Sequence, residues 1–86
     1  MKRQITVYSL PNCSQCRMTK MWLDKNGIEY KTVDLLTSPD DAAAVQALGY
    51  TAAPVVIVSN GDPETDIHWF GFNVGFLAKY AAGEVA

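Results

Sequence analysis

The sequence predicts a single α/β domain, a four-stranded mixed sheet flanked by three helices in the order βαβαββα. At the N-terminus, a strand pattern, an uninterrupted helical stretch and a second strand pattern follow one another. Further along, the nearly all-apolar run Val55–Val58 is typical of a buried central strand. A chain of 86 residues leaves no room for a second core, so we expect one domain over residues 1–86.

The first half of the chain predicts a βαβ unit. Gln4–Tyr8 alternates polar and apolar side chains and is rich in β-branched residues, which indicates a strand. Turn-forming residues follow, and then no Gly or Pro interrupts Cys13–Asn26, which we predict to be a helix ended by Gly27. Ile28–Leu36 is the second strand candidate. A strand, a helix and a strand in this order predict a parallel pair with a right-handed crossover.

The second half predicts a helix, a hairpin and a last helix. Ser38–Asp41 offers an N-cap serine, a proline at the first helical position and two acids at the positive helix end. We expect this helix to continue through Ala42–Leu48. After the central strand, Asn60–Pro63 carries loop-forming residues, and Asp66–Phe70 is predicted to return antiparallel to that strand. Val74–Ala82 is predicted to be the last helix.

Composition excludes several classes of protein. Seven Lys and Arg against nine Asp and Glu give a net charge of −2, which argues against a nucleic-acid binder. The longest mostly apolar, uncharged stretch, Leu48–Val58, is far shorter than the ~20 residues that cross a bilayer. The N-terminus shows no apolar stretch typical of a secretion signal, so we expect a cytoplasmic protein.

The two cysteines carry the functional prediction. Cys13 and Cys16 form a CxxC motif that follows a strand and a proline-containing turn and begins a helix. Unpaired N–H groups and the positive end of the helix dipole then point at Cys13 and favour its thiolate. Such a position lowers the pKa of a cysteine from ~8.5 to ~7 or below. The motif therefore predicts thiol–disulfide exchange, with Cys13 attacking a partner disulfide and the more shielded Cys16 releasing the product.

Other interpretations of the same residues stay open at this point. One alternative is a pair of inert buried thiols, and another is half of a metal site that a second chain completes, with His68 as a third ligand. A lone histidine in a strand is more often structural. Pro54 precedes the apolar run, where a proline is tolerated, and only about 5–6% of X-Pro bonds are cis.

Several segments together resemble the NrdH-redoxin family, glutaredoxin-like small proteins with the thioredoxin fold. The segments are Cys13–Cys16 after the first strand, Ala53–Val56, and His68–Trp69 followed by Gly71–Phe72. The resemblance extends from about Ile5 to Phe72 and implies that Cys13 is the nucleophile and Cys16 the resolving thiol. It also implies a cis Ala53–Pro54 bond that faces the cysteines, with no metal ligand between them.

Partner binding is predicted at two places near the motif. The backbone of Ala53, beside Pro54, would pair with an extended segment of the partner. Trp69 and Phe72, with Phe70, would form an apolar docking surface. Because Trp69 and Phe70 occupy alternating strand positions, they must face opposite sides of the sheet, and at least one is expected to be exposed.

The resemblance also implies partners for a small monomeric electron donor. Family members take electrons from thioredoxin reductase, an NADPH flavoenzyme, and pass them to class Ib ribonucleotide reductase for deoxyribonucleotide synthesis, while holding no cofactor themselves. Two alternatives are a glutathione-dependent glutaredoxin and a metal or iron–sulfur-binding module. Leu10 and Gly75 replace charged residues with which glutaredoxins contact glutathione, which argues against tight glutathione binding. Asn73 and Val74 depart from the family's usual Arg-Pro.

Overall fold

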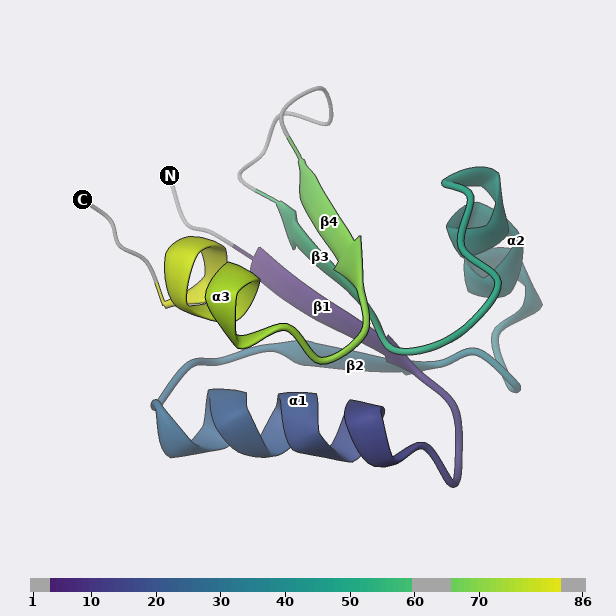
Figure 1. Cartoon of the computed structure of the whole chain (residues 1–86). Coiled ribbons are helices and arrows are strands. Elements are labelled where there is room, and N and C mark those ends of the chain that lie inside the picture. The colour runs from purple at the N-terminus through teal and green to yellow at the C-terminus, as the bar shows by residue number, and fades with distance from the viewer. Residues whose placement is uncertain (1–3, 60–65, 83–86) are drawn as a thin grey trace.

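A computed structural model describes residues 4–59 and 66–82 and shows helices packed on a central sheet (Figure 1). In chain order the elements are β1 (Gln4–Ser9), α1 (Ser14–Lys25), β2 (Lys31–Asp34), α2 (Pro39–Ala47), β3 (Val55–Ser59), β4 (Ile67–Phe70), α3 (Val74–Phe76) and the π-helix η2 (Leu77–Ala81). The predicted order of strands and helices is confirmed. The loop expected at Asn60–Pro63 lies outside the described residues.

The sheet is mixed, as predicted, with the strand order β2-β1-β3-β4. β1 pairs with β2 in parallel, whereas β3 pairs antiparallel with both β1 and β4. β3 is therefore an inner strand, which explains why Val55, Val56 and Val58 are all buried. This topology places the C-terminal end of β1 beside the start of β3, with Tyr8 opposite Val55.

One face of the sheet carries the main core, which α1 and the α3–η2 segment cover. The buried cluster comprises Ile5, Val7, Val56, Val58 and Trp69 from the strands, Leu23 from α1, and Leu77 and Ala81 from η2. In Figure 1, α2 lies away from α1 and α3. Its N-terminal Asp41 acts electrostatically on Tyr8, whose side chain points opposite to that of Val7. The helices therefore cover both faces of the sheet.

Helix α1 ends where the sequence predicts. Gly27 has a φ of +68°, a conformation that glycine adopts without a Cβ penalty. Its N–H donates to the carbonyl of Asp24, and the N–H of Ile28 donates to the carbonyl of Leu23. This pair of hydrogen bonds is a Schellman motif and pairs two of the last carbonyls of the helix.

The second strand is shorter than expected. Ile28 belongs to the helix-ending motif of α1 and not to β2, because its N–H is bonded to the carbonyl of Leu23. At the other end, the side chain of Asp34 accepts the N–H of Leu36 at 2.9 Å, which forms a turn and stops the strand. Local hydrogen bonds at the end of α1 and to the Asp34 side chain thus make the strand shorter than predicted at both ends.

Two predicted details of the helices need correction. Ser38 is at the N-cap position of α2, but its hydroxyl oxygen accepts no backbone N–H of the helix. The hydroxyl instead donates to the carboxylate of Asp41 at 2.8 Å. The last helical segment is α-helical only over Val74–Phe76, and the N–H of Ala82 then reaches the carbonyl of Leu77, five residues back. No feature of the sequence marks this wider turn.

Within the described ranges, no helix is long and apolar enough to cross a membrane.

Candidate active site

The CxxC motif sits at the junction of β1 and α1. After β1 the chain turns through Asn12, which has a φ of +59°, a left-handed conformation that asparagine tolerates better than most residues. Cys13 follows in an extended conformation as the N-cap of α1, so the predicted position of this cysteine is confirmed. The turn thus leaves Cys13 at the helix start, where the backbone N–H groups lack partners within the helix.

The two cysteines form a disulfide in this structure, with a Cα–Cα distance of 5.2 Å. This separation lies within the usual range for disulfides, so the helix start holds the two sulfur atoms within bonding reach. Their exposure differs, because Cys16 is only 2% exposed whereas Cys13 is half-buried. An external disulfide can therefore approach Cys13 and not Cys16.

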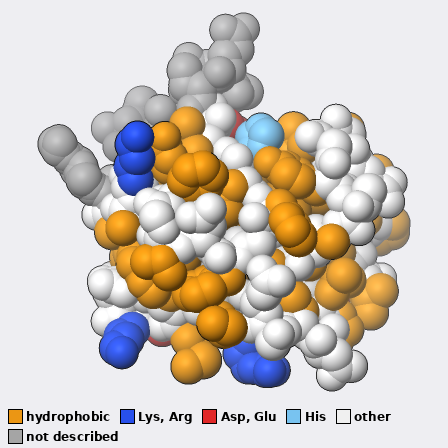
Figure 2. All heavy atoms as spheres, viewed as in Figure 1, with side chains coloured by type: hydrophobic (Ala, Val, Ile, Leu, Met, Phe, Trp, Pro, Cys, Tyr) orange, Lys and Arg blue, Asp and Glu red, His pale blue; other side chains and the backbone are white. Residues whose placement is uncertain are grey.

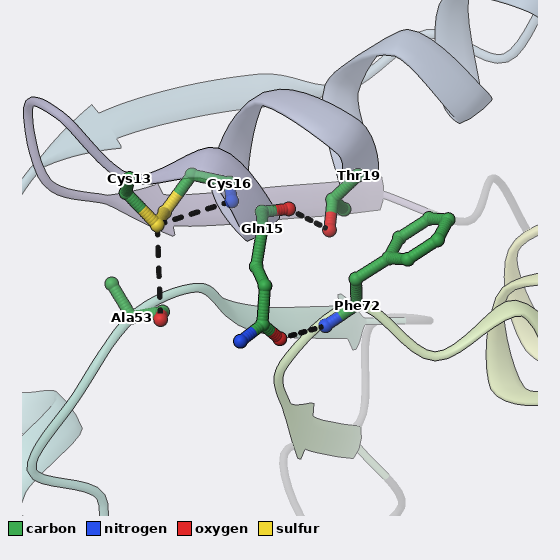
Figure 3. Close-up of a disulfide and its surroundings, with 6 residues drawn as sticks. All are labelled: Cys13, Gln15, Cys16, Thr19, Ala53 and Phe72. Atoms are coloured by element: carbon green, nitrogen blue, oxygen red, sulfur yellow. Dashed lines mark hydrogen bonds between the residues drawn. A yellow bond between two sulfur atoms is a disulfide. The ribbon is translucent and has the colours of Figure 1, made fainter.

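The backbone of α1 points a hydrogen-bond donor at Cys13. The N–H of Cys16 donates to the Sγ of Cys13 at 3.1 Å (Figure 3), so the sulfur caps the helix as a serine oxygen would. The first turn of α1 contains no acidic side chain that would oppose a negative charge there. Once the disulfide is reduced, the hydrogen bond and the helix dipole both favour the thiolate of Cys13.

The entry to β3 lies against the sulfur of Cys13. The Ala53–Pro54 bond is cis, as the family resemblance implies, and the Sγ of Cys13 lies 3.8 Å from the carbonyl oxygen of Ala53 (Figure 3). Since a disulfide sulfur carries no proton, this contact becomes a hydrogen bond only when Cys13 is a thiol. Pro54 is buried and its carbonyl accepts the N–H of Gly71 at 2.8 Å. The segment before β3 is thereby fixed beside the cysteines.

Gln15, between the two cysteines, ties the motif to the segment after β4. Its Oε1 accepts the N–H of Phe72 at 3.0 Å, and its own carbonyl accepts the hydroxyl of buried Thr19 at 2.8 Å (Figure 3). An ideal Cβ on Gly71 would lie 3.1 Å from the same Oε1. The sequence alone did not predict this contact of Gln15, because its partner is 57 residues away and no local pattern indicates it.

The three aromatic residues predicted to form a docking surface differ in exposure. Trp69 is only 3% exposed, so its expected role as a docking residue is wrong. Its ring packs into the core, with the centroid of Phe76 at 5.4 Å in an edge-on arrangement. Phe70, on the opposite side of β4, is 46% exposed, and Phe72 is half-buried beside Gln15. Of the three predicted docking aromatics, Phe70 and Phe72 are therefore the ones that a partner can reach.

The structure does not bring His68 and the cysteines together as metal ligands. Among residues 4–59 and 66–82, no group of three or more His, Cys, Asp or Glu side chains is arranged to hold a metal ion. The Nδ1 of His68 lies 2.8 Å from the hydroxyl of Tyr50, beyond the end of α2. This contact gives His68 a structural partner.

This arrangement defines a class of protein, a thioredoxin-fold protein whose paired cysteines cycle between dithiol and disulfide. The family model for glutaredoxin matches residues 5–62. The chain is 35% identical to the glutaredoxin-like protein NrdH of Lactococcus lactis subsp. cremoris, over 90% of this chain and 99% of that protein. It is 32% identical to NrdH of Escherichia coli K12, over 88% of this chain and 86% of that protein. The chain therefore belongs to the glutaredoxin family, among its NrdH glutaredoxin-like redox proteins.

Solved structures agree with this assignment. The NrdH-redoxin of Escherichia coli superposes with a TM-score of 0.75 and 29% identity, covering 87% of this chain and 91% of that one. That protein is described as glutaredoxin-like with a thioredoxin-like activity profile. Mitochondrial thioredoxin 3 of Saccharomyces cerevisiae, at 18% identity and a TM-score of 0.65, shares the fold. The predicted thioredoxin-like fold and family resemblance are both confirmed.

Proposed function

We propose that the protein is a small electron donor that reduces disulfides of partner proteins by thiol–disulfide exchange. The unequal exposure of the two cysteines at the start of α1 is the observation that carries this proposal. Cys13 faces solvent and accepts a backbone N–H, whereas Cys16 is buried next to it. One sulfur is placed to attack a partner, and the other is placed to complete the exchange.

The first step uses the thiolate of Cys13 in the reduced protein. Its electron pair attacks one sulfur of the partner disulfide, so a Cys13–partner bond forms as the partner's S–S bond breaks. The leaving sulfur departs as a thiolate and takes a proton from solvent. The N–H of Cys16, 3.1 Å from the attacking sulfur, stabilises the charge before attack.

The second step releases the partner. The thiol of Cys16 loses its proton and attacks the Sγ of Cys13, which forms the disulfide present in this structure. The second partner sulfur leaves as a thiolate and is protonated. Two electrons thus pass from the Cys13–Cys16 pair to the partner, while the two protons that the partner gains come from the Cys16 thiol and from solvent. An external reductant must then restore the dithiol.

We further propose that class Ib ribonucleotide reductase accepts these electrons and that thioredoxin reductase supplies them. The protein would then work in the cytoplasm as a monomer without a bound cofactor, because NADPH and flavin belong to the reductase. The NrdH relatives and the thioredoxin-like activity profile of the Escherichia coli protein support this assignment. Leu10, which is uncharged and borders Cys13, gives no charge with which to hold a glutathione carboxylate.

Trapping of a mixed disulfide tests the division of roles between the cysteines. Cys16→Ser should accumulate a covalent complex with a disulfide-containing protein through Cys13, because the second step is lost. Cys13→Ser is the matched control and should trap none, since Cys16 is only 2% exposed. Non-reducing gel electrophoresis followed by mass spectrometry identifies the adduct. Equal trapping by both variants would contradict the assignment.

A coupled assay tests the source of electrons. Oxidation of NADPH is followed with a model disulfide, once with thioredoxin reductase and once with glutathione and glutathione reductase. We expect turnover with thioredoxin reductase and at most slow turnover with glutathione. Turnover only in the glutathione arm would identify a glutathione-dependent glutaredoxin, the alternative function.

A further inference from the structure

A groove along α1 begins at the cysteines and is bordered by two basic residues. It encloses about 350 Å³, and its lining includes Cys13, Cys16, Arg17, Lys20 and Met21. Asp24 and Tyr30 also line it. Figure 2 shows Lys and Arg side chains on the edge of the molecule that α1 forms. Because Cys13 and Cys16 both line this groove, whatever occupies it lies next to the reacting disulfide.

The basic residues share one side of the helix with the nucleophile. Cys13, Arg17, Lys20 and Asp24 are separated by four, three and four positions, the spacing that places side chains in one row on an α-helix. With a rise of ~1.5 Å per residue, Arg17 lies about 6 Å and Lys20 about 10 Å along the helix from Cys13. The row therefore presents two cations at fixed distances from the reacting sulfur.

The two cations in this row have no carboxylate partner among the described residues, whereas the acidic residue interacts with a tyrosine. Asp24, the acidic residue of the groove, interacts with the hydroxyl of Tyr30. Together with partial burial, which is the larger cause, this hydrogen bond raises the pKa of Tyr30 above its ordinary value. Within the part of the chain that the structure describes, neither Arg17 nor Lys20 is paired with a carboxylate. The half of the groove nearest the cysteines thus has a net positive charge.

We propose that Arg17 and Lys20 determine specificity by binding carboxylates in the disulfide-bearing segment of the protein that is reduced. This inference rests on the proposed disulfide-reducing function and adds the chemistry of the substrate. An extended chain advances ~3.3 Å per residue, so acidic residues about two and three positions from the attacked cysteine would reach Arg17 and Lys20. The preferred substrate is an acidic, extended peptide segment.

The length of the groove favours a peptide over a small thiol. From Cys13 to Asp24 the helix advances about 16 Å, the span of roughly five residues of extended chain. The exposed positions of Arg17 and Met21 leave this path open along the helix. Charge complementarity with a carboxylate-bearing segment would supply both orientation and a faster encounter.

Matched peptides test the inference. The substrates are three disulfide peptides that carry Glu, Gln or Lys at the second and third positions from the cysteine. The KM for each peptide is measured with the wild type, with R17Q, with K20Q and with the double variant. We expect the wild type to show the lowest KM for the Glu peptide. Each single change should raise that KM about two- to fivefold, in the range of an exposed ion pair, and leave the KM for the Gln peptide within twofold.

Lys25→Gln is the control, because it removes the same charge from the same helix but lies outside the groove. An equal loss in this variant, or equal KM values for the Glu and Gln peptides with wild type, would overturn the inference. A loss seen with glutathione disulfide and not with the Glu peptide would also overturn it. Reduction of the Gln peptide by wild type tests the proposed function separately, since that substrate needs no cation.

Discussion

Replacement of Gly71 by alanine tests the connection between the active-site helix and the segment after β4. Gly71 has a φ of +89°, and an alanine Cβ would lie 3.1 Å from the Oε1 of Gln15. The positive φ costs an L-residue about 1–2 kcal/mol. Weakening of the Gln15–Phe72 hydrogen bond adds up to about 0.5–1.5 kcal/mol. We therefore expect Gly71→Ala to lower the free energy of unfolding by about 1.5–3.5 kcal/mol.

A double-mutant cycle separates the two contributions. In a Gln15→Ala background the contact with Oε1 is gone, so Gly71→Ala should cost only the ~1–2 kcal/mol of its backbone conformation. Gly27→Ala is the matched control, because Gly27 also has a positive φ but an added Cβ would meet no atom within 4 Å. Its cost should not depend on residue 15.

Urea unfolding of the oxidised proteins, followed by circular dichroism, measures these differences. In thermal unfolding, a loss of 1 kcal/mol corresponds to about 4–8 °C in Tm for a domain of this size. If Gly71→Ala costs the same with and without Gln15, the side chain of Gln15 does not restrain this segment. A neutral Gly71→Ala would refute the argument from the backbone conformation as well.

Three further outcomes follow from the described contacts. Asn12→Val should destabilise the protein by about 1–2 kcal/mol in urea unfolding, because Asn12 has a φ of +59°, whereas Asn12→Gly should change little; equal effects would contradict this. Burial and, to a smaller extent, Asp41 raise the pKa of Tyr8 above 10.0. Stability from this shift is fully present below pH 10 and is lost as pH rises through the raised pKa, so Tyr8→Phe should flatten the alkaline part of the unfolding profile; an unchanged profile would contradict this. Leu77→Ala should cost about 2–5 kcal/mol in the same assay, since Leu77 is 0% exposed, and a loss below 1 kcal/mol would show that the core repacks.

The fold could be predicted largely because its signals are local. The turn residues before Cys13, the glycine after α1 and the apolar run of β3 each determine a neighbouring element by backbone preference or burial. The position of Cys13 at the helix start follows from the same signals, and with it the expected chemistry. The cis Ala53–Pro54 bond does not, because the residues alone favour trans, and only the family resemblance predicted it.

The remaining features depend on long-range packing. Alternation along β4 predicts that Trp69 and Phe70 face opposite sides, but not which side the helices cover, and the structure buries Trp69 under α3 and η2. The Gln15–Phe72 hydrogen bond likewise requires β4 to return beside β3 before the two residues can meet. The site was thus predictable at its reacting atoms and unpredictable in the contacts that surround them.

The acidity of Cys13 in the reduced wild-type protein is the most direct test of the proposed function. Alkylation by iodoacetamide is measured across pH, and peptide mapping assigns the adduct to Cys13 or Cys16. Because the helix start and the N–H of Cys16 favour the thiolate, Cys13 should react with a midpoint clearly below the ordinary ~8.5, while Cys16 stays protected. A midpoint for Cys13 at the ordinary value, or equal reactivity of both cysteines, would contradict the mechanism.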